Sequence, residues 1–295
     1  MDIPWSPEQK RRLEELGATN ELRAAGEPRV AGVPPASSEL GARFGSASQR
    51  DAAFQELEHA LVKERRAELA ALQKEARPPA LYRLERRLAD ALEEESFSRV
   101  LTPTLMSRGM LAKMGIKEGH PLFSKIFWVD ERRCLRPMLA PHLYSLLADL
   151  LRVWEKPVRI FEAGSCFRRE TQGARHAAEF TMLNLCEMGL PAERCRSRLE
   201  ELAARLMQAA GIREYSLQSE SSIVYGETID LVARGVELGS AALGPHALDR
   251  PWRLTEPWVG LGLGLERLVM VREGGDSLAR WGRNLGYLDG LPLRL

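Results

Sequence analysis

Between residues 158 and 264 the chain repeatedly shows short segments with β-strand patterning, and this feature most restricts the fold. Helical patterning interrupts the series at 191–210, and hairpins join the other strands. Strands joined by hairpins pair antiparallel, whereas parallel strands need long crossovers. The sequence therefore predicts an α+β fold with an antiparallel sheet flanked by helices. The expected strands are 158–163, 166–171, 179–188, 213–219, 222–232, 235–243 and 258–264.

The N-terminal part has a different character. A serine, a proline and a glutamine at capping-box spacing predict a helix over 6–17. Residues 24–49 are rich in Gly, Pro, Ala and Ser without periodicity, which is typical of a linker or a loosely ordered arm. A charged helix is expected at 49–76, ended by two prolines. We therefore divide the chain into a helical arm at 1–76 and a second domain at 77–295.

Basic residues on the arm permit two interpretations. They could contact a nucleic acid, or they could belong to a solvated helix in which acidic residues alternate with them. Charge alone favours the solvated helix, because the whole chain carries 42 basic and 41 acidic residues. The residues concerned are Lys10, Arg11, Arg12, Lys63, Arg65 and Arg66.

Between the arm and the strand-rich region, helices and strands are mixed. Pro103 lies within an expected strand, and because proline cannot donate to a β-ladder it should sit at an edge or an interface. The expected elements are a helix at 79–95, a strand at 97–105, a helix at 107–115, a hairpin at 125–139, and a helix at 141–155. A further helix, 265–272, follows the last strand.

The overall composition excludes several classes of protein. The net charge of +1 is incompatible with a broad cationic surface for nucleic acid, although a local basic patch is allowed. No apolar run approaches membrane-spanning length and no signal peptide is visible, so a cytoplasmic protein without a membrane partner is expected. Cysteine and histidine spacings match no structural metal site or disulfide framework. Neither a dinucleotide fingerprint nor a P-loop is present.

The segment FRRETQGARHAAEF at 167–180, followed much later by GLGLERL at 262–268, suits a purine nucleotide with a triphosphate. Arg168 and Glu170 are two apart on a strand and share a face. A guanidinium can grip phosphate and carboxylate oxygens together, and a carboxylate can accept from the adenine amino group. Phe180 offers a ring on which a base can stack.

These two segments resemble motifs 2 and 3 of the class II aminoacyl-tRNA synthetases. Four further segments resemble the pyrrolysyl-tRNA synthetases, in register from about residue 80 to the C-terminus: LRPMLAPHLY, FTMLNLCEMG, VYGETIDL and GYLDG. RDAAFQELEHALVKERR, at 50–66, resembles the arm of the separately encoded catalytic subunit found in bacteria. The resemblance implies the class II synthetase catalytic fold at 77–295, and a tRNA-contacting role for the arm.

The resemblance also implies residue roles in binding ATP. Arg168 would contact the α-phosphate, Glu170 the adenine and His176 the triphosphate. Phe180 would stack on adenine, and Arg267 would hold the γ-phosphate. The two arginines would be the catalytic residues. The matching positions for magnesium bound with ATP are Glu237 and Ser240.

The implied amino-acid pocket is mostly apolar and fits a long lysine stem with a methylpyrroline ring. Asn184 would donate to the side-chain amide carbonyl of the substrate, and Tyr225 would close over the ring on a mobile hairpin. His142 and Gly239 depart from the family pattern, which has asparagine at the first position. The implied pocket residues are Ala140, Leu143, Tyr144, Leu147, Asn184, Cys186, Tyr225 and Trp258.

The resemblance implies a pyrrolysine–tRNA ligase that uses ATP and Mg²⁺ to form an aminoacyl adenylate and then charges a UAG-decoding suppressor tRNA. A homodimer is expected, with the Pro103 strand near its two-fold axis, and a separate N-terminal tRNA-binding protein is a candidate partner. Three alternatives stay open. They are a class II synthetase for another large apolar amino acid such as phenylalanine, a non-acylating paralogue, and an RNA-binding module.

Overall fold

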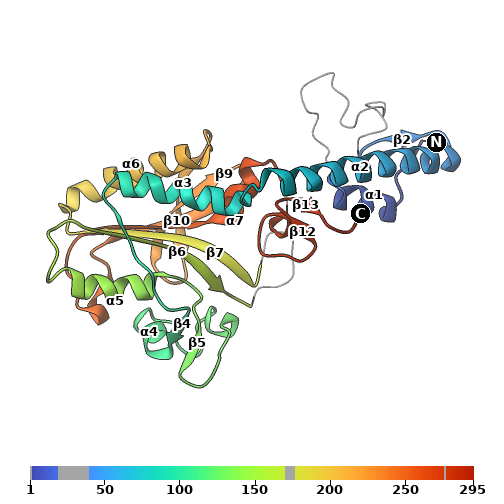
Figure 1. The fold of residues 1–295 in the computed structure, drawn as a ribbon. Helices are drawn as coiled ribbons and strands as arrows, with labels where there is room; N and C mark the ends of the chain where they lie inside the picture. Colours follow the sequence, from blue (N-terminus) through green and yellow to red (C-terminus); the bar gives the residue numbers. More distant parts are fainter. Residues whose placement is uncertain (1, 19–39, 170–176, 276) are drawn as a thin grey trace. The chain divides into compact units, whose positions relative to one another are not determined.

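The computed structural model describes residues 2–18, 40–169, 177–275 and 277–295. The chain divides into two compact units, both drawn in Figure 1. The arm unit consists of residues 1–79 and 284–295, and the sheet unit consists of residues 80–283. Among the described residues, none of the helices has the length and apolar character needed to cross a bilayer.

The arm unit begins with the predicted capped helix. In α1 (Pro7–Glu15), the Ser6 hydroxyl accepts from the Gln9 backbone N–H at 3.2 Å, and the Gln9 side chain accepts from the Ser6 N–H at 3.0 Å. The long helix α2 (Ala47–Glu75) matches the expected charged helix within two residues at its N-terminal end. Leu13 of α1, its C-cap residue Leu16, and Leu57 and Leu61 of α2 are buried with Trp5 in one small core.

Part of the expected linker is instead structured. β1 (Ile3–Pro4) pairs antiparallel with β2 (Arg43–Phe44). The rings of Trp5 and Phe44 lie 4.4 Å apart, and Leu40 is buried. Aromatic packing thus orders the end of this segment, while residues 24–39 of the expected linker lie outside the described part of the chain.

The C-terminal segment 284–295 belongs to the arm unit, whereas the sequence-based division assigned it to the second domain. It forms a small hairpin from β12 (Tyr287–Leu288) and β13 (Leu291–Pro292). The Arg12 guanidinium donates to the Arg294 carbonyl at 3.1 Å, and Leu295 packs against the arm core. These contacts join residues remote in sequence, so local patterning could not reveal them.

The sheet unit is built around one seven-stranded sheet. Its strands are β3 (Ser98–Arg99), β6 (Val158–Phe167), β7 (Glu179–Met188), β8 (Ser216–Ser222), β9 (Gly226–Ala233), β10 (Val236–Gly244) and β11 (Trp258–Gly264). Their spatial order is β3-β6-β7-β11-β10-β9-β8, and only the β3–β6 pair is parallel. The α+β fold with an antiparallel sheet flanked by helices is therefore confirmed.

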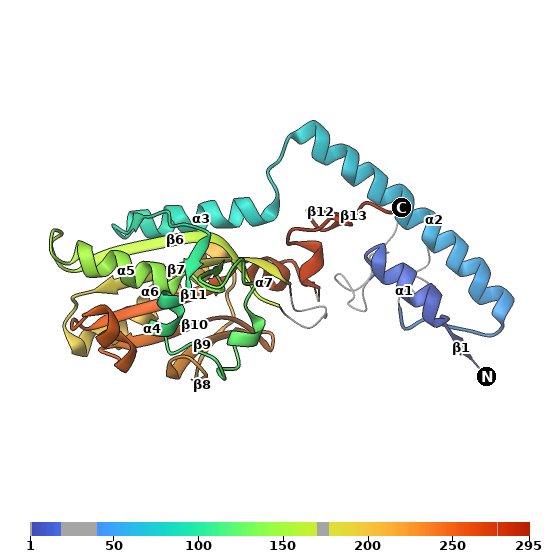
Figure 2. The ribbon, with the colours of Figure 1, turned by 90° about the horizontal axis from the view of Figure 1, so that it is seen from below.

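Helices cover the two faces of this sheet unequally. One face carries α3 (Ala80–Glu94), α6 (Cys195–Ala210) and α7 (Leu265–Arg272), and the main hydrophobic core lies beneath them (Figure 1). The other face carries α4 (Arg108–Lys113) and α5 (Ala140–Leu150), seen from below in Figure 2. Because strand side chains alternate between faces, every second residue of the central strands points away from the main core.

Several expected strands differ in the structure. The strand expected at 97–105 is reduced to β3 and, beyond Pro103, β4 (Leu105–Ser107). Between these strands the Thr102 N–H donates to the Glu162 carboxylate at 3.2 Å instead of to a ladder. The strand expected at 158–163 and the beginning of the one expected at 166–171 form one strand, β6, because β7 pairs with it continuously through Gly164. β6 ends at Phe167, and residues 170–171 lie outside the described residues.

The hairpin expected at 125–139 forms as a short ladder. Trp128 and Cys134 make an antiparallel bridge, and the Leu135 N–H donates to the Phe127 carbonyl at 2.9 Å. β5 (Arg133–Leu135) also pairs with β4, which was not expected. α5 ends at Leu150, earlier than the expected Glu155, in a series of turns. The helices expected at 79–95 and 265–272 agree closely with α3 and α7. The helix expected at 191–210 begins later, at Cys195, and ends at Ala210, where Gly211 caps it in a left-handed conformation (φ 78°).

Candidate active site

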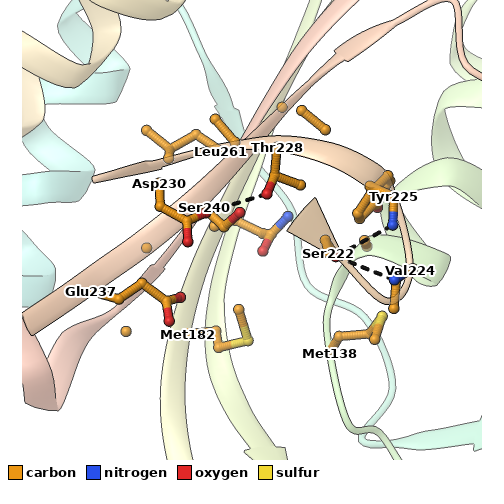
Figure 3. Close-up of a pocket in the computed structure, with 18 of the residues that line it drawn as sticks. Met138, Met182, Ser222, Val224, Tyr225, Thr228, Asp230, Glu237, Ser240 and Leu261 are labelled. Carbon is orange, nitrogen blue, oxygen red and sulfur yellow. Dashed lines mark hydrogen bonds between the residues drawn. The ribbon is translucent and has the colours of Figure 1, made fainter. Parts of the chain in front are cut away.

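A cavity of about 520 Å³ opens on the sheet face opposite the main core. β7 shows how the strand period builds it: Leu183 belongs to the main core on one face of the sheet, whereas Asn184 and Cys186 line the cavity on the other. Gly260, Gly262 and Gly264 occupy alternate positions on β11 and line the same cavity. Because they have no side chains, they leave space in it. Figure 3 shows side chains from several strands converging on this space.

The structure brings together every described residue that the sequence placed in the site. Glu170 and His176 lie outside the described residues. The predicted residues lining the cavity are Ala140, Leu143, Tyr144, Leu147, Arg168, Phe180, Asn184, Cys186, Tyr225, Glu237, Ser240, Trp258 and Arg267. Their shared position is a finding, while their individual roles stay predictions.

One end of the cavity carries two arginines. The Arg168 Nε donates to the Pro137 carbonyl at 2.9 Å, and its guanidinium lies 5.3 Å from the centre of the Phe180 ring. The Arg267 Nη1 donates to the Glu237 carbonyl at 3.0 Å and lies 3.3 Å from its carboxylate. An aromatic face beside fixed cations suits a base and its phosphates.

The start of β7 is held by two residues that the sequence analysis missed. The Glu266 carboxylate accepts from the Thr181 N–H at 2.8 Å, and Arg283 donates to the Thr181 hydroxyl at 2.7 Å. Burial raises the pKa of Glu266, whose side chain is almost fully enclosed. Glu266 could have been noticed in GLGLERL as an acidic residue in the first turn of α7. Its contact with Thr181 could not be predicted, because no sequence spacing relates the two residues.

Oxygen donors gather at the same end on β9 and β10. Glu237 and Ser240 are joined there by Asp230, which pairs with Ser240 across the sheet and was not predicted (Figure 3). Magnesium takes oxygen ligands and is commonly held by one or two carboxylates together with substrate phosphates. The described residues contain no cluster of three or more metal-ligating side chains. The carboxylates and the hydroxyl at this end of the cavity are donors of the kind that can hold magnesium together with substrate phosphates.

The other end of the cavity is aromatic and aliphatic. The Tyr144 ring stacks on Trp252 with centroids 5.7 Å apart and meets Trp258 edge-on at 5.8 Å. The Trp258 indole N–H donates to the buried Asp249 carboxylate at 2.8 Å, which fixes the ring plane. Burial raises the pKa of Tyr144, so its hydroxyl stays protonated. This wall suits a long apolar group.

Asn184 occupies its place because the opposite residue is a glycine. Asn184 pairs with Gly262 across β7 and β11. A Cβ atom at Gly262 would lie 2.6 Å from the Asn184 side-chain oxygen, closer than real contacts allow. Gly239, the departure noted near the magnesium positions, has a similar reason, since its Cβ would strike the Gly262 carbonyl.

His142, the other departure, lies beside the cavity without lining it. Its Nδ1 is 3.2 Å from the Thr102 hydroxyl, next to the buried pair of Arg136 and Glu162. Burial and the nearby Arg136 charge lower the pKa of His142, so the ring is neutral. This residue therefore belongs to a polar network behind the pocket.

Comparisons with known proteins show which families the chain resembles. Residues 68–250 match the family model of the phenylalanyl-tRNA synthetase beta chain CLM domain. A crystal structure of pyrrolysyl-tRNA synthetase from Desulfitobacterium hafniense aligns with TM-score 0.87 and 47% identity, covering 100% of both chains. A second structure of that organism's pyrrolysyl-tRNA synthetase aligns with TM-score 0.86 and 46% identity, over 99% of this chain and 98% of the other.

Curated relatives match over a shorter region. The alpha subunit of phenylalanine–tRNA ligase from Methanothermobacter thermautotrophicus is 28% identical over 163 residues, which are 53% of this chain and 31% of that subunit. The chain thus spans about a third of the length of this relative.

Proposed function

The chain belongs to the class II aminoacyl-tRNA synthetases, in their pyrrolysyl-tRNA synthetase branch, and we propose that it is a pyrrolysine–tRNA ligase. The observation that carries this proposal is one cavity with two chemically distinct ends, joined by Asn184. Two arginines and the half-buried Phe180 ring lie at one end, and an aromatic and aliphatic wall lies at the other. Such a cavity suits ATP beside an amino acid with a long apolar side chain.

In the proposed first step, the amino-acid carboxylate attacks the α-phosphorus of ATP, an aminoacyl adenylate forms and pyrophosphate leaves. Arg168 is suited to hold a carboxylate oxygen and an α-phosphate oxygen together, because its guanidinium presents donors in one plane. Arg267 would bind the γ-phosphate once its contact with the Glu237 carboxylate gives way. Both arginines act by orienting the reactants and stabilising the developing charge.

Magnesium would be held by Glu237 and Ser240 together with the triphosphate oxygens. When bound there, it would supply positive charge beside the phosphate oxygens. Glu170 and His176, which lie outside the described residues, are proposed to contact the adenine and the triphosphate. Asp230, across from Ser240, supports the same arrangement by adding a second carboxylate to this end of the cavity.

In the proposed second step, a terminal ribose hydroxyl of tRNA attacks the adenylate carbonyl and AMP leaves. This step needs no covalent intermediate with the enzyme. Cys186, the cysteine in the cavity wall, is buried, and burial raises its pKa, so it carries no thiolate. Its role is that of a small apolar wall residue.

The alternative of a phenylalanine-specific synthetase is not favoured. Similarity to the phenylalanine–tRNA ligase alpha subunit covers about half of this chain, whereas similarity to pyrrolysyl-tRNA synthetase covers all of it at higher identity. A non-acylating paralogue and an RNA-binding module are also disfavoured, because Arg168 and Arg267 both line the apolar cavity.

Further proposals concern partners and location. We propose that the enzyme is a cytoplasmic homodimer with the Pro103 segment near its two-fold interface, and that it cooperates with a separate tRNA-binding protein. We also propose that the arm contacts a UAG-decoding tRNA. On the arm, Arg12 lies 2.7 Å from Glu58 and Arg65 lies 2.6 Å from Glu68. Of the six basic residues singled out in the sequence, Lys10, Arg11, Lys63 and Arg66 are exposed and are the ones proposed to contact tRNA.

Replacing Asn184 with alanine should relax the choice of amino acid while leaving ATP binding unchanged. The side-chain amide is the polar group placed between the two ends of the cavity, and its removal leaves a substrate amide carbonyl unpaired. We expect the KM for pyrrolysine to rise about tenfold, since such a loss is typically about 1–2 kcal/mol. Pyrophosphate-exchange kinetics measure it, and an unchanged preference over phenylalanine contradicts the assigned role.

A second variant acts on Asn184 without changing it. Gly262→Ala should displace the Asn184 amide, because the new methyl group would lie 2.6 Å from its oxygen. The expected result is a raised KM for pyrrolysine with folding retained. Gly264→Ala, on the same strand face, is the matched control, because its nearest contact would be an ordinary 3.7 Å. Equal KM values for the two variants contradict the crowding argument.

A further inference from the structure

The loop between β8 and β9 forms part of the cavity wall. Residues 222–226, called the tip loop below, begin at Ser222 and turn at Gly226, whose φ is 71°. The Ser222 hydroxyl accepts from the N–H groups of Val224 at 3.2 Å and Tyr225 at 3.4 Å, so the loop holds its own shape (Figure 3). Tyr225 lines the cavity, while Ile223 is 63% exposed.

Two histidines from distant parts of the sequence bind the backbone of this loop. The Nε2 of His246 lies 2.8 Å from the Tyr225 carbonyl oxygen. The Nε2 of His120 lies 3.1 Å from the Ile223 carbonyl oxygen. The His246 ring also meets the Tyr225 ring edge-on, with centroids 5.7 Å apart. The tip loop is thus attached at two of its main-chain carbonyls, those of Ile223 and Tyr225, by residues from two separate segments.

The two histidines share one hydrogen-bonding pattern, which fixes their tautomer. The Nδ1 of His246 accepts from the Leu248 N–H at 3.1 Å, and the Nδ1 of His120 accepts from the Leu122 N–H at 3.1 Å. A ring nitrogen that accepts carries no proton, so the proton of each neutral ring is on Nε2. Each Nε2 therefore donates to a carbonyl of the tip loop, which can only accept.

The His246 attachment extends to the apolar end of the cavity. His246 precedes η4 (Ala247–Trp252), and its N–H donates to the Asp249 carboxylate at 2.6 Å. The same Asp249 oxygen accepts from the Trp258 indole at 2.8 Å. One short helix thus connects the tip loop to the wall against which the amino-acid side chain would lie. His120 similarly precedes η2 (Phe123–Lys125) and the wall residue Leu122.

We propose that His120 and His246 are positioning residues that hold the tip loop closed over the amino-acid end of the cavity. They set the affinity for the amino acid without contacting it, and they leave ATP binding untouched. The expected change in amino-acid affinity rests on the proposed function. The attachment of the tip loop by the two histidines does not. Because the acceptors are main-chain carbonyls, the attachment is removed only by changing the histidines.

Matched substitutions distinguish the two hydrogen bonds of each histidine, the one from Nε2 to the tip loop and the one that Nδ1 accepts within its own segment. Asparagine at position 246 keeps an acceptor for the Leu248 N–H but is too short to reach the Tyr225 carbonyl. Glutamine places an amide donor near the Nε2 position and keeps that reach. The same pair applies at His120. If the histidines act only as caps, the asparagine variants behave as wild type.

Steady-state exchange kinetics with pyrrolysine and ATP give the first readout. H246N is expected to raise the KM for pyrrolysine roughly two- to tenfold, the usual effect of one lost hydrogen bond. The KM for ATP should not change, and H246Q should recover most of the wild-type affinity. The double variant H120N/H246N should raise the KM for pyrrolysine more than either single variant does. An equal rise in both KM values, or no rise in any asparagine variant, overturns the proposal.

Amide hydrogen exchange on the full-length protein without substrates gives a second readout that needs no activity. The amides of residues 222–226 should exchange faster in H120N and H246N than in wild type, and the glutamine variants should restore protection. Unchanged protection in the asparagine variants overturns the attachment itself. If the wild-type protein showed no pyrrolysine-dependent exchange, the proposed function would be refuted. The hydrogen-exchange test of the loop attachment would still be valid.

Discussion

Replacing Arg168 with alanine is expected to slow adenylate formation by roughly 10²–10³-fold, the usual cost of losing one donor to a developing negative charge. Arg168 lines the cavity beside Phe180, and its Nε bond to the Pro137 carbonyl at 2.9 Å holds the guanidinium in place. Its loss removes both a positive charge and a planar donor pair at the point of attack. Single-turnover adenylate formation with pyrrolysine and ATP measures the effect.

Two further variants make this test specific. Arg168→Lys keeps the positive charge but loses the planar pair of guanidinium donors. Its rate of adenylate formation should therefore fall between those of the wild-type enzyme and Arg168→Ala. Arg169→Ala is the matched control, because Arg169 is exposed and lies over the Phe127 ring at 5.3 Å, away from the cavity. If Arg168→Ala and Arg169→Ala have the same rate, Arg168 has no catalytic role.

Glu162→Ala is expected to lower the free energy of unfolding by about 3–5 kcal/mol, because it leaves a buried arginine without its counter-charge. The Glu162 carboxylate lies 2.7 Å from Arg136 Nη1, and the two side chains are 0% and 4% exposed. It also accepts from the Thr102 hydroxyl at 2.6 Å. Urea denaturation of the full-length protein measures the change.

A matched comparison comes from an ion pair at the surface. Arg86 and Asp90, one helical turn apart in α3, are 85% and 60% exposed, and Asp90→Ala should barely change stability. Glu162→Gln should be milder than Glu162→Ala, since the amide still accepts from Thr102. A loss for Glu162→Ala no larger than that for Asp90→Ala is the result that contradicts this account of the buried pair.

The parts of the site that could be predicted depend on local patterns. Phe180, Asn184 and Cys186 share one face of β7 because strand side chains alternate, and this period is visible in the sequence. Arg267 follows a glycine-rich strand at the start of a helix, which is equally local. For the same reason most helices and the antiparallel character of the sheet were predicted correctly.

The remaining parts depend on contacts between remote segments. Asp230 joins the oxygen donors only through the register of β9 against β10, and Asp249 meets Trp258 only after η4 has folded back. The strand expected at 97–105 is short because Thr102 bonds to Glu162, sixty positions later in the chain. Propensity and periodicity carry no information about such partners.

The cavity also explains how one site could bind two unlike molecules. Its polar end is held by charged side chains, with Glu266 and Arg283 fixing the start of β7. Its apolar end is held by stacked aromatic rings and by a loop attached from outside. Substitutions at the polar end should therefore alter ATP binding, and substitutions at the apolar end should alter amino-acid binding. The proposed variants test the two ends one at a time.

ATP–pyrophosphate exchange by the wild-type protein, with pyrrolysine compared against the twenty standard amino acids, tests the central claim most directly. We expect rapid exchange with pyrrolysine and with Nε-acylated lysines, and only background exchange with every standard amino acid. Exchange supported by phenylalanine or another standard amino acid, without pyrrolysine activity, would contradict the proposed substrate while keeping the class II chemistry. Absence of exchange with every amino acid would contradict the proposed reaction itself.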